Sequence, residues 1–424
     1  METESIESFR ETFFDRLKEI ATGYGINIES EIESHYFGRL IKELSEKFGQ
    51  KTVILIDEYD KPITDHLENL EIAGQLMEFI KSVFVRMKGN DAHIRFVLLT
   101  GVSKFSKVSL FSGMNQITDI TMHEQFAPLL GYTQEELELH FAPYLELLTE
   151  KRGIPKNELL TEIKHWYNGY SWDASTRVYN PFSILSLFQS LRFDNYWFSS
   201  GTPSYLIKLM REKKYDVNIL KNAESNILTF DSGSLDKIDP INLLFQTGYL
   251  TVSQKRNLYQ IEEYLLNFPN FEVETSFYSY LIGDISNTHP YEALTLALKL
   301  RQSLENGEVH RFETVLKSLF AQIPSNLFIE EEKFYHSLFI MISYLCRIEV
   351  EAEVNTNIGR IDGVIEFSES IHIVEFKINR PAEEGLKQII NKKYYEKYLT
   401  KGKPIYLMGI SFSGQSIQTV YLKL

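Results

Sequence analysis

The chain has 424 residues and a net charge of −14 at neutral pH, which argues against a protein that coats nucleic acid indiscriminately. This length predicts two or three domains, the 43% hydrophobic content is ample for real cores, and the 29 Phe and 24 Tyr argue against long disordered stretches. The single cysteine, Cys346, excludes an internal disulfide framework and a cysteine-based zinc site. No apolar run reaches the length of a membrane span and the N-terminus is not signal-like, so we expect a soluble, cytoplasmic protein with no membrane partner.

The first predicted unit near the N-terminus is a strand, a helix and a second strand. Val53–Ile56 is an apolar run followed by Asp57 and Glu58, which predicts a buried parallel strand with two acids at its C-terminal edge. Ile72–Met87 has helical spacing, and Arg95–Ser103 predicts the second strand. In P-loop ATPases such a strand, called Walker B, uses its Asp for Mg²⁺ and its Glu to polarise the attacking water.

The phosphate-binding loop that should accompany this strand is missing. No G-x-x-x-x-G-K-[S/T] motif occurs, and the nearest imitation, Gly49–Thr52, precedes a strand, whereas such a loop must follow one and open a helix. Two helices are predicted upstream, over Ser5–Gly23 and Ser30–Phe48. We therefore interpret Asp57 and Glu58 as the remnant of an ATPase-like scaffold and do not expect this chain to bind ATP. The alternative is an ATPase whose P-loop lies in an omitted N-terminal region.

Helices predominate in the middle of the chain. Thr133–Trp166 predicts the helices of a lid, and residues 191–310 are expected to be mainly helical, with strands at Gly248–Val252 and Leu258–Glu262. From residue 311 onward, two leading helices are followed by strands. These elements are predicted over Phe312–Phe320, Glu331–Leu345, Ile348–Val354, Ile361–Phe367, Ile371–Ile378, Pro404–Ile410 and Ser416–Leu422.

The predicted strands Ile361–Phe367 and Ile371–Ile378 are expected to form a hairpin around the polar turn Ser368–Ser370. Folding the chain about this turn places Asp362 opposite Glu375, and the period of two puts Lys377 on the same face as Glu375. The two carboxylates are hard oxygen ligands of the kind that Mg²⁺ prefers, and Glu353 on the preceding strand can join them. Lys377 would orient the attacking water or neutralise charge on a phosphate, so the pattern predicts metal-assisted phosphodiester hydrolysis. The alternative is a cross-strand charge pair in a solvated hairpin.

A basic, aromatic helix is predicted directly after the hairpin. Between Lys377 and Lys403 there are eight basic and three acidic residues, with tyrosines interleaved. Such a helix beside a metal site can receive a phosphate backbone, and the alternative is a solvated lysine-rich helix. The candidates for nucleic-acid binding are Lys387, Lys392, Lys393 and Tyr394.

Two resemblances support these interpretations. The order Asp362, Glu375, Lys377 resembles the D…(D/E)xK core of the PD-(D/E)XK nuclease superfamily. More narrowly, GRIDGVIEF…IHIVEFKINRPAEEGLKQIINKKYYEKY resembles the nuclease module attached to a bacterial AAA-ATPase-like family. Further segments that resemble motifs of that family are TGVSKFSKVSLFSGMNQITDIT, WYNGYSW, VYNPFSIL, YWFSSGTPSYL and LLFQTGYLTV.

The resemblance implies roles for individual residues. By position, the three core residues match the catalytic triad of the module, and Glu353 matches the acidic residue before its GRID segment. Gln388 and Tyr394, in the helix after the hairpin, match its "QI…Y" element, so that Gln388 would hydrogen-bond a substrate group or a metal ligand. The alternative for Gln388 is a polar residue on a helix face.

The expected fold class is therefore α/β, with a nuclease-type mixed α/β domain at the C-terminus. The expected domains are an incomplete P-loop ATPase-like domain over 1–190, a mainly helical middle region over 191–310 and the PD-(D/E)XK domain over 311–424. The favoured function is a Mg²⁺- or Mn²⁺-dependent endonuclease or exonuclease acting on DNA or RNA, with the ATPase-like domain as a regulatory scaffold. The alternative is a catalytically silent scaffold that binds nucleic acid or protein. The oligomeric state is left open.

Overall fold

The computed structural model shows a mixed α/β protein of about 54% helix and 19% strand, which confirms the expected fold class. The residues that it describes are 5–29, 32–102, 117–200, 206–207, 210, 220–226, 239–323, 332–346, 350–356, 359–414 and 416–424. Within these ranges, no helix is both long enough and apolar enough to cross a membrane.

The chain forms two compact units, each assembled from segments that are not consecutive in sequence. The first unit consists of Met1–Pro143, Asn168–Pro181 and Asn222–Pro269. The second unit consists of Tyr144–Tyr167, Phe182–Lys221 and Asn270–Leu424. The division into three consecutive domains stays a prediction.

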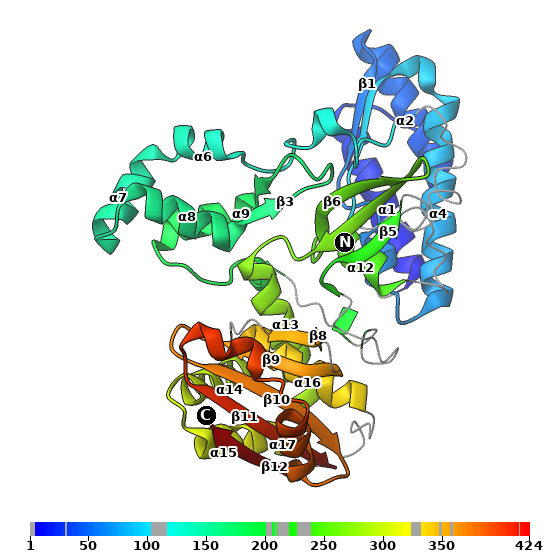
Figure 1. The fold of residues 1–424 in the computed structure, drawn as a ribbon. Coiled ribbons are helices and arrows are strands. Elements are labelled where there is room, and N and C mark those ends of the chain that lie inside the picture. Colours follow the sequence, from blue (N-terminus) through cyan, green and yellow to red (C-terminus); the bar gives the residue numbers. More distant parts are fainter. Residues whose placement is uncertain are drawn as a thin grey trace. The chain divides into compact units, whose positions relative to one another are not determined.

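The first unit opens with the expected strand–helix–strand arrangement (Figure 1). Its first elements are α1 (Ile6–Gly23), α2 (Glu33–Phe48), β1 (Thr52–Ile56), α3 (Lys61–Thr64), α4 (Leu70–Gly89), η1 (Asp91–His93) and β2 (Ile94–Leu99). β1 and β2 pair in parallel, as predicted, with Val53 opposite Phe96 and Leu55 opposite Leu98. The apolar stripes of α1 and α2 meet through Leu17, Ala21, Tyr36 and Leu40.

The expectation that this strand is buried is wrong for one of its faces. Val53 and Leu55 are 50% and 68% exposed, and their partners Phe96 and Leu98 are also exposed. Ile54 on the opposite face is buried. Because side chains alternate between the two faces of a strand, an apolar run cannot show by itself whether both faces are covered.

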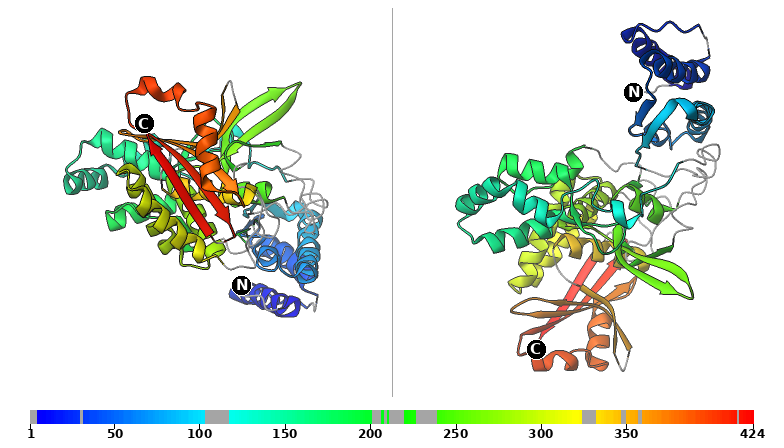
Figure 2. Two further views of the ribbon diagram at one scale, coloured as in Figure 1. Left: turned by 60° about the horizontal axis from the view of Figure 1, so that its bottom comes forward. Right: turned by 90° about the horizontal axis from the view of Figure 1, so that it is seen from above.

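The remaining elements of the first unit include a sheet of three strands. They are η2 (Glu124–Phe126), α6 (Gln134–His140), β3 (Asn168–Tyr170), β4 (Val178–Tyr179), β5 (Ala223–Asn226), α12 (Pro240–Gln246), β6 (Thr251–Leu258) and β7 (Ile261–Asn267). The sheet has the order β5-β7-β6, and Figure 2 shows β6 and β7 as a long light green hairpin. The predicted strand Leu258–Glu262 is wrong, since Tyr259 and Gln260, at φ 51° and 69°, form the turn inside it. This turn lacks the glycine or asparagine that normally signals such a conformation.

The second unit combines helices with the C-terminal sheet. Its helices before the sheet are α8 (Lys156–Tyr167), α9 (Pro181–Ser190), η3 (Trp197–Ser200), α13 (Phe271–Ser286), α14 (Pro290–Glu305), α15 (Val309–Ala321) and α16 (Glu332–Leu345). α7 (Ala142–Arg152) begins in the first unit and continues in the second, and α9 has its first residue, Pro181, in the first unit. α15 and α16 confirm the two predicted leading helices, and α6 to α8 confirm helices across the segment expected to form a lid.

The C-terminal sheet has five strands in the order β12-β11-β10-β9-β8. The elements of this region are β8 (Val350–Thr356), β9 (Gly359–Glu366), β10 (Ile371–Ile378), α17 (Ala382–Asn391), η6 (Glu396–Lys401), β11 (Ile405–Ser413) and β12 (Ser416–Lys423). β10 and β11 run parallel because α17 crosses between them, and the other neighbours are antiparallel. The sheet is therefore mixed, as expected for the C-terminal domain.

Helices cover both faces of this sheet (Figures 1 and 2). On one face, Ile373 and Leu407 of the sheet form a core with Ile389 of α17 and with two tyrosines that follow it, Tyr394 and Tyr398. On the other face, aromatic rings of the sheet meet those of α15 and α16. The members of this second cluster are Phe320, Tyr335, Phe339, Phe376 and Phe412.

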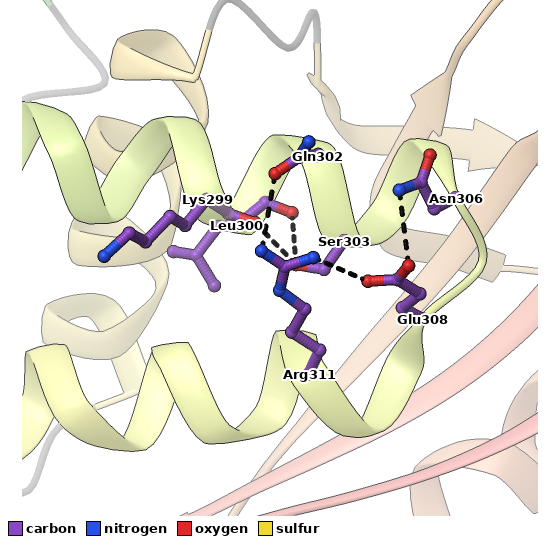
Figure 3. A network of polar contacts seen from close by, with 7 residues as sticks. All are labelled: Lys299, Leu300, Gln302, Ser303, Asn306, Glu308 and Arg311. Atoms are coloured by element: carbon purple, nitrogen blue, oxygen red, sulfur yellow. Dashed lines mark hydrogen bonds and ion pairs between the residues drawn. The ribbon is translucent and has the colours of Figure 1, made fainter.

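A polar network closes the connection between α14 and α15 (Figure 3). Glu308 accepts hydrogen bonds from Arg311 at 3.0 Å and from Asn306 at 3.3 Å, and Arg311 also donates to Gln302 at 3.4 Å. α15 then reaches the edge of the sheet, where the hydroxyl of Thr419 on β12 donates to Glu313.

The basic helix is shorter than predicted. α17 ends at Asn391 with Lys392 as its C-cap, and Lys393 adopts a left-handed φ of 49°. Tyr394 therefore lies after the helix, not within it as expected, because a residue in this conformation ends an α-helix.

Candidate active site

The candidate site lies where β9 and β10 separate. The antiparallel register runs from Ile371 opposite Glu366 to Val374 opposite Gly363, so Asp362 and Glu375 occupy the next positions on the two strands. Beyond this point a side chain replaces the backbone as hydrogen-bond acceptor. Oδ2 of Asp362 accepts a hydrogen bond from the backbone N–H of Phe376 at 2.8 Å. A carboxylate thus occupies the place of a ladder bond, and the strands open next to two acids.

Glu375 is the most deeply buried member of the site, with 2% of the residue exposed. Its Oε1 accepts hydrogen bonds from Lys377 Nζ at 3.3 Å and from the side-chain amide of Gln388. Its Oε2 is buried and has no hydrogen-bond partner among the described residues. Burial, followed by the nearby charge of Asp362, raises the pKa of Glu375 to about 7, and the Lys377 charge opposes this shift.

Three elements supply the side chains of the site. Asp362 is half-buried on β9, Glu375 and Lys377 lie two residues apart on β10, and Gln388 reaches the same face from α17. The side chain of Lys377 is 15% exposed, so its ammonium meets Glu375 in a partly dry setting. A charge pair that is shielded from water interacts more strongly than a surface pair, which distinguishes this group from a solvated hairpin pair.

Glu353 belongs to the neighbouring strand β8. Ala352 pairs with Gly363 and Val354 pairs with Ile361, so the backbone of Glu353 stands beside that of Asp362 in the ladder. The side chain of Glu353 lies outside what the structure describes.

The site has features that suit a hard divalent cation. The described residues contain no group of three or more His, Cys, Asp and Glu side chains that could hold a metal ion, and the carboxylates that lie close together here are those of Asp362 and Glu375. Glu375 keeps one buried oxygen without a hydrogen-bond donor, and the proximity of Asp362 disfavours its charged form. A cation would relieve both conditions. Mg²⁺ commonly binds through one or two carboxylates and retains several waters, so this donor set fits Mg²⁺ or Mn²⁺.

The residues expected to bind nucleic acid differ in their exposure. Lys387 is exposed on α17, whereas exposed Lys393 is paired with Glu396 at 3.1 Å. Lys392 is partly buried, with its ammonium 5.7 Å from the ring centre of Tyr394. Tyr394 is 2% exposed and belongs to the core beneath α17, so its ring offers no surface on which a base could stack.

The two acids expected at the end of β1 are exposed in the first unit. The hydroxyl of Thr100, which follows β2, donates to Asp57, and the backbone N–H of Glu58 donates to the same hydroxyl at 3.4 Å. Glu58 has a φ of 51°, which is unusual for a residue other than glycine.

Sequence reasoning missed Asp60, the buried acid of this first-unit loop. It is 1% exposed and accepts from the backbone N–H of Val102 at 3.0 Å, which ties the end of β1 to the end of β2. The position of Asp60 immediately before α3, which carries a proline in its first turn, is the signal that could have marked it as a structural residue.

Comparison with known proteins identifies a family at each end of the chain. Residues 1–111 match the AAA-ATPase-like family described as predicted AAA-ATPase, and residues 330–421 match the PD-(D/E)XK nuclease superfamily. A protein of Azotobacter chroococcum mcd 1, described as "Uncharacterized protein in vnfD 5'region", is 35% identical over 391 residues, covering 91% of this chain and 73% of that protein. No solved structure matches the chain significantly. The chain therefore belongs to the family of this Azotobacter protein and carries an AAA-ATPase-like region together with a PD-(D/E)XK nuclease superfamily domain.

Proposed function

We propose that the C-terminal domain is a divalent-metal-dependent nuclease that hydrolyses phosphodiester bonds in DNA or RNA. The observation that carries this proposal is the convergence of Asp362, Glu375, Lys377 and Gln388 on one face of the sheet, where β9 and β10 open. The superfamily match over residues 330–421 supports the same chemistry. The AAA-ATPase-like region would act as a regulatory scaffold.

Asp362 and Glu375 would hold the metal ion, with Glu353 as a further candidate ligand. When bound, such an ion acidifies a water and neutralises charge on the scissile phosphate. The N–H of Phe376 holds one oxygen of Asp362, and Gln388 holds one oxygen of Glu375, so both carboxylates are oriented before substrate arrives.

Lys377 supplies the positive charge of the proposed mechanism. Its ammonium lies within 3.3 Å of Glu375 and can donate to the attacking water or to a phosphate oxygen. Its partly buried position strengthens this interaction, because little water competes for the same charge.

Nucleic acid would approach across α17 and the turn that follows it. Lys387 is exposed there and can meet phosphates, Lys393 is exposed but paired with Glu396, and we assign Tyr394 a packing role because its ring is buried. Lys401 and Lys403 both pair with Glu366, so they contribute less charge to this surface. Binding should therefore depend on a few lysines and weaken as salt concentration rises.

The proposal is tested with the purified chain on single- and double-stranded DNA and RNA, in Mg²⁺, in Mn²⁺ and in chelator. Cleavage should require metal and should fall at least a hundredfold in Asp362→Asn and Lys377→Met. Glu369→Gln is the matched control, since this exposed carboxylate lies in the turn at the far end of the same hairpin. Absence of cleavage in both metals would exclude the nuclease, and salt-sensitive binding without cleavage would support the silent scaffold instead.

A further inference from the structure

The hydrogen bond between Gln388 and Glu375 depends on how closely α17 approaches the sheet. Gln388 is the only described residue of α17 whose side chain bonds to Glu375. The amide of Gln388 can extend from α17 only by the length of one glutamine side chain. The spacing between α17 and β10 therefore decides whether the hydrogen bond to Glu375 can form.

Gly409 allows the helix to approach on the β11 side. It is the residue that pairs with Glu375 in the parallel β10–β11 register, so it lies beside the site. A Cβ at Gly409 would stand 2.8 Å from the backbone nitrogen of Leu386 and even closer to the carbonyl oxygen of Ala382, both in α17. The helix backbone therefore occupies the space that any side chain at this strand position would need.

Gly385 makes the same contact from the helix side. A Cβ at this position would lie 2.9 Å from the carbonyl oxygen of Glu375 and 3.3 Å from the Cα of Gly409. Gln388 follows three residues later, which places it on the same face of α17, one turn further along. The tightest point of the helix–sheet contact thus lies directly next to the residue that carries the buried carboxylate.

We propose that Gly385 and Gly409 are positioning residues that set the height of α17 so that Gln388 orients Glu375. The proposal rests on the proposed nuclease function and deepens it. Glu375 is 2% exposed and its second oxygen has no hydrogen-bond partner among the described residues, so the direction of that oxygen depends on how the first one is held. An added methyl group at Gly385 must push the helix outward, and one at Gly409 must push it further, because the atoms that each methyl group meets belong to the backbone.

The test combines Gly385→Ala with Gln388→Ala, singly and together. Gly74→Ala is the matched control, because Gly74 also lies within a helix but an added Cβ there meets no atom within 4 Å. Mn²⁺ affinity is measured by titration calorimetry, kcat and KM on a fluorescent DNA or RNA substrate, and Tm by circular dichroism. Both single variants should weaken Mn²⁺ binding and lower kcat about tenfold with little change in KM. The double variant should lose no more Mn²⁺ affinity and kcat than Gln388→Ala alone, because both changes disrupt the same hydrogen bond between Gln388 and Glu375.

If the fold-losses of the two single variants in Mn²⁺ affinity and kcat multiply in the double variant, the proposal is wrong. It is also wrong if Gly385→Ala lowers Tm but leaves Mn²⁺ affinity and kcat unchanged. If the wild type cuts nothing, the nuclease proposal fails, and the Mn²⁺ titrations still decide the positioning proposal. Gln388→Asn provides a variant that leaves the glycine contact intact. Asparagine is one methylene shorter than glutamine, and α17 cannot move closer to compensate because it already touches the sheet. This variant should therefore bind Mn²⁺ as weakly as Gln388→Ala. Wild-type affinity in Gln388→Asn would show that the spacing is not set by the glycines.

Discussion

Asp362 and Phe376 are joined by a hydrogen bond of 2.8 Å from a backbone N–H to a carboxylate, across the point where two strands separate. The bond gives Asp362 a structural task in addition to its proposed chemical one. It satisfies a backbone donor that has left the ladder, and it holds the carboxylate beside Glu375.

The two tasks of Asp362 can be separated by substitution. Asp362→Asn keeps an acceptor for the N–H of Phe376, so it should abolish cleavage while changing stability by less than about 1 kcal/mol. Asp362→Ala removes the acceptor too and should cost about 1–3 kcal/mol in addition. Urea unfolding monitored by circular dichroism, together with the cleavage assay, checks this. Equal stability of the two variants would contradict the structural task.

Glu375 should make the metal-free protein less stable as pH rises. Its folded pKa is raised from 4.5 to about 7, so between these values the folded state holds a proton that the unfolded state has lost. Its contribution to the free energy of unfolding therefore falls from about pH 4.5 to about pH 7 and is constant above. Glu375→Gln should gain about 1–3 kcal/mol relative to wild type between pH 5 and pH 8, measured by urea unfolding in chelator. A pH-independent difference between the two proteins would count against the shift.

His372 on β10 should act in the opposite direction. It is fully buried and stacks on Tyr406 with ring centres 4.7 Å apart, and burial lowers its pKa from 6.5 to about 4. The unfolded state then binds a proton that the folded state does not, so stability is lost as pH falls from about 6.5 to about 4. His372→Phe should reduce this acid-induced loss of unfolding free energy by about 1–3 kcal/mol. Unfolding curves at pH 4.5 and pH 7 provide the measurement, and an unchanged acid limb would refute the assignment.

Glu272 on α13 should be critical for the stability of the second unit. It is fully buried, and its carboxylate accepts hydrogen bonds from the backbone N–H groups of Tyr196 and Trp197 and from the hydroxyl of Ser183. Glu272→Ala leaves these donors unpaired and should cost about 3 kcal/mol or more. Glu292→Ala, at an exposed position in the first turn of α14, should change stability by less than about 0.5 kcal/mol. Comparable losses in both variants would contradict this role.

Cleavage by this chain should not respond to ATP. The sequence has no G-x-x-x-x-G-K-[S/T] motif, and Asp57 is engaged by the hydroxyl of Thr100. Addition of ATP with Mg²⁺ should leave the cleavage rate within about twofold, and Asp57→Asn should behave as wild type. A rate that rises with ATP and depends on Asp57 would show that the ATPase-like region binds nucleotide after all.

The registers near the two ends of the chain followed from local pattern. Alternating apolar residues and a polar turn predicted that Asp362 stands opposite Glu375 with Lys377 on the same face, and the strand pairing and the Lys377–Glu375 contact agree with this geometry. The parallel pairing of β1 with β2 followed instead from the order strand, helix, strand in the sequence. Side-chain direction in a strand depends only on the parity of the position, which can be read from the chain itself.

Contacts between distant segments were beyond such patterns. The turn at Tyr259 and Gln260, the burial of Tyr394 and the exposed face of β1 all depend on what the rest of the chain packs against. Gly409 and Gly385 show the same limit at the site, since neither residue signals by itself that a helix and a strand touch there. Alternation along the strands is enough to predict which side chains share a face of the sheet. The distance between α17 and that face becomes visible only in the folded protein, because it is set by backbone contacts between segments far apart in the chain.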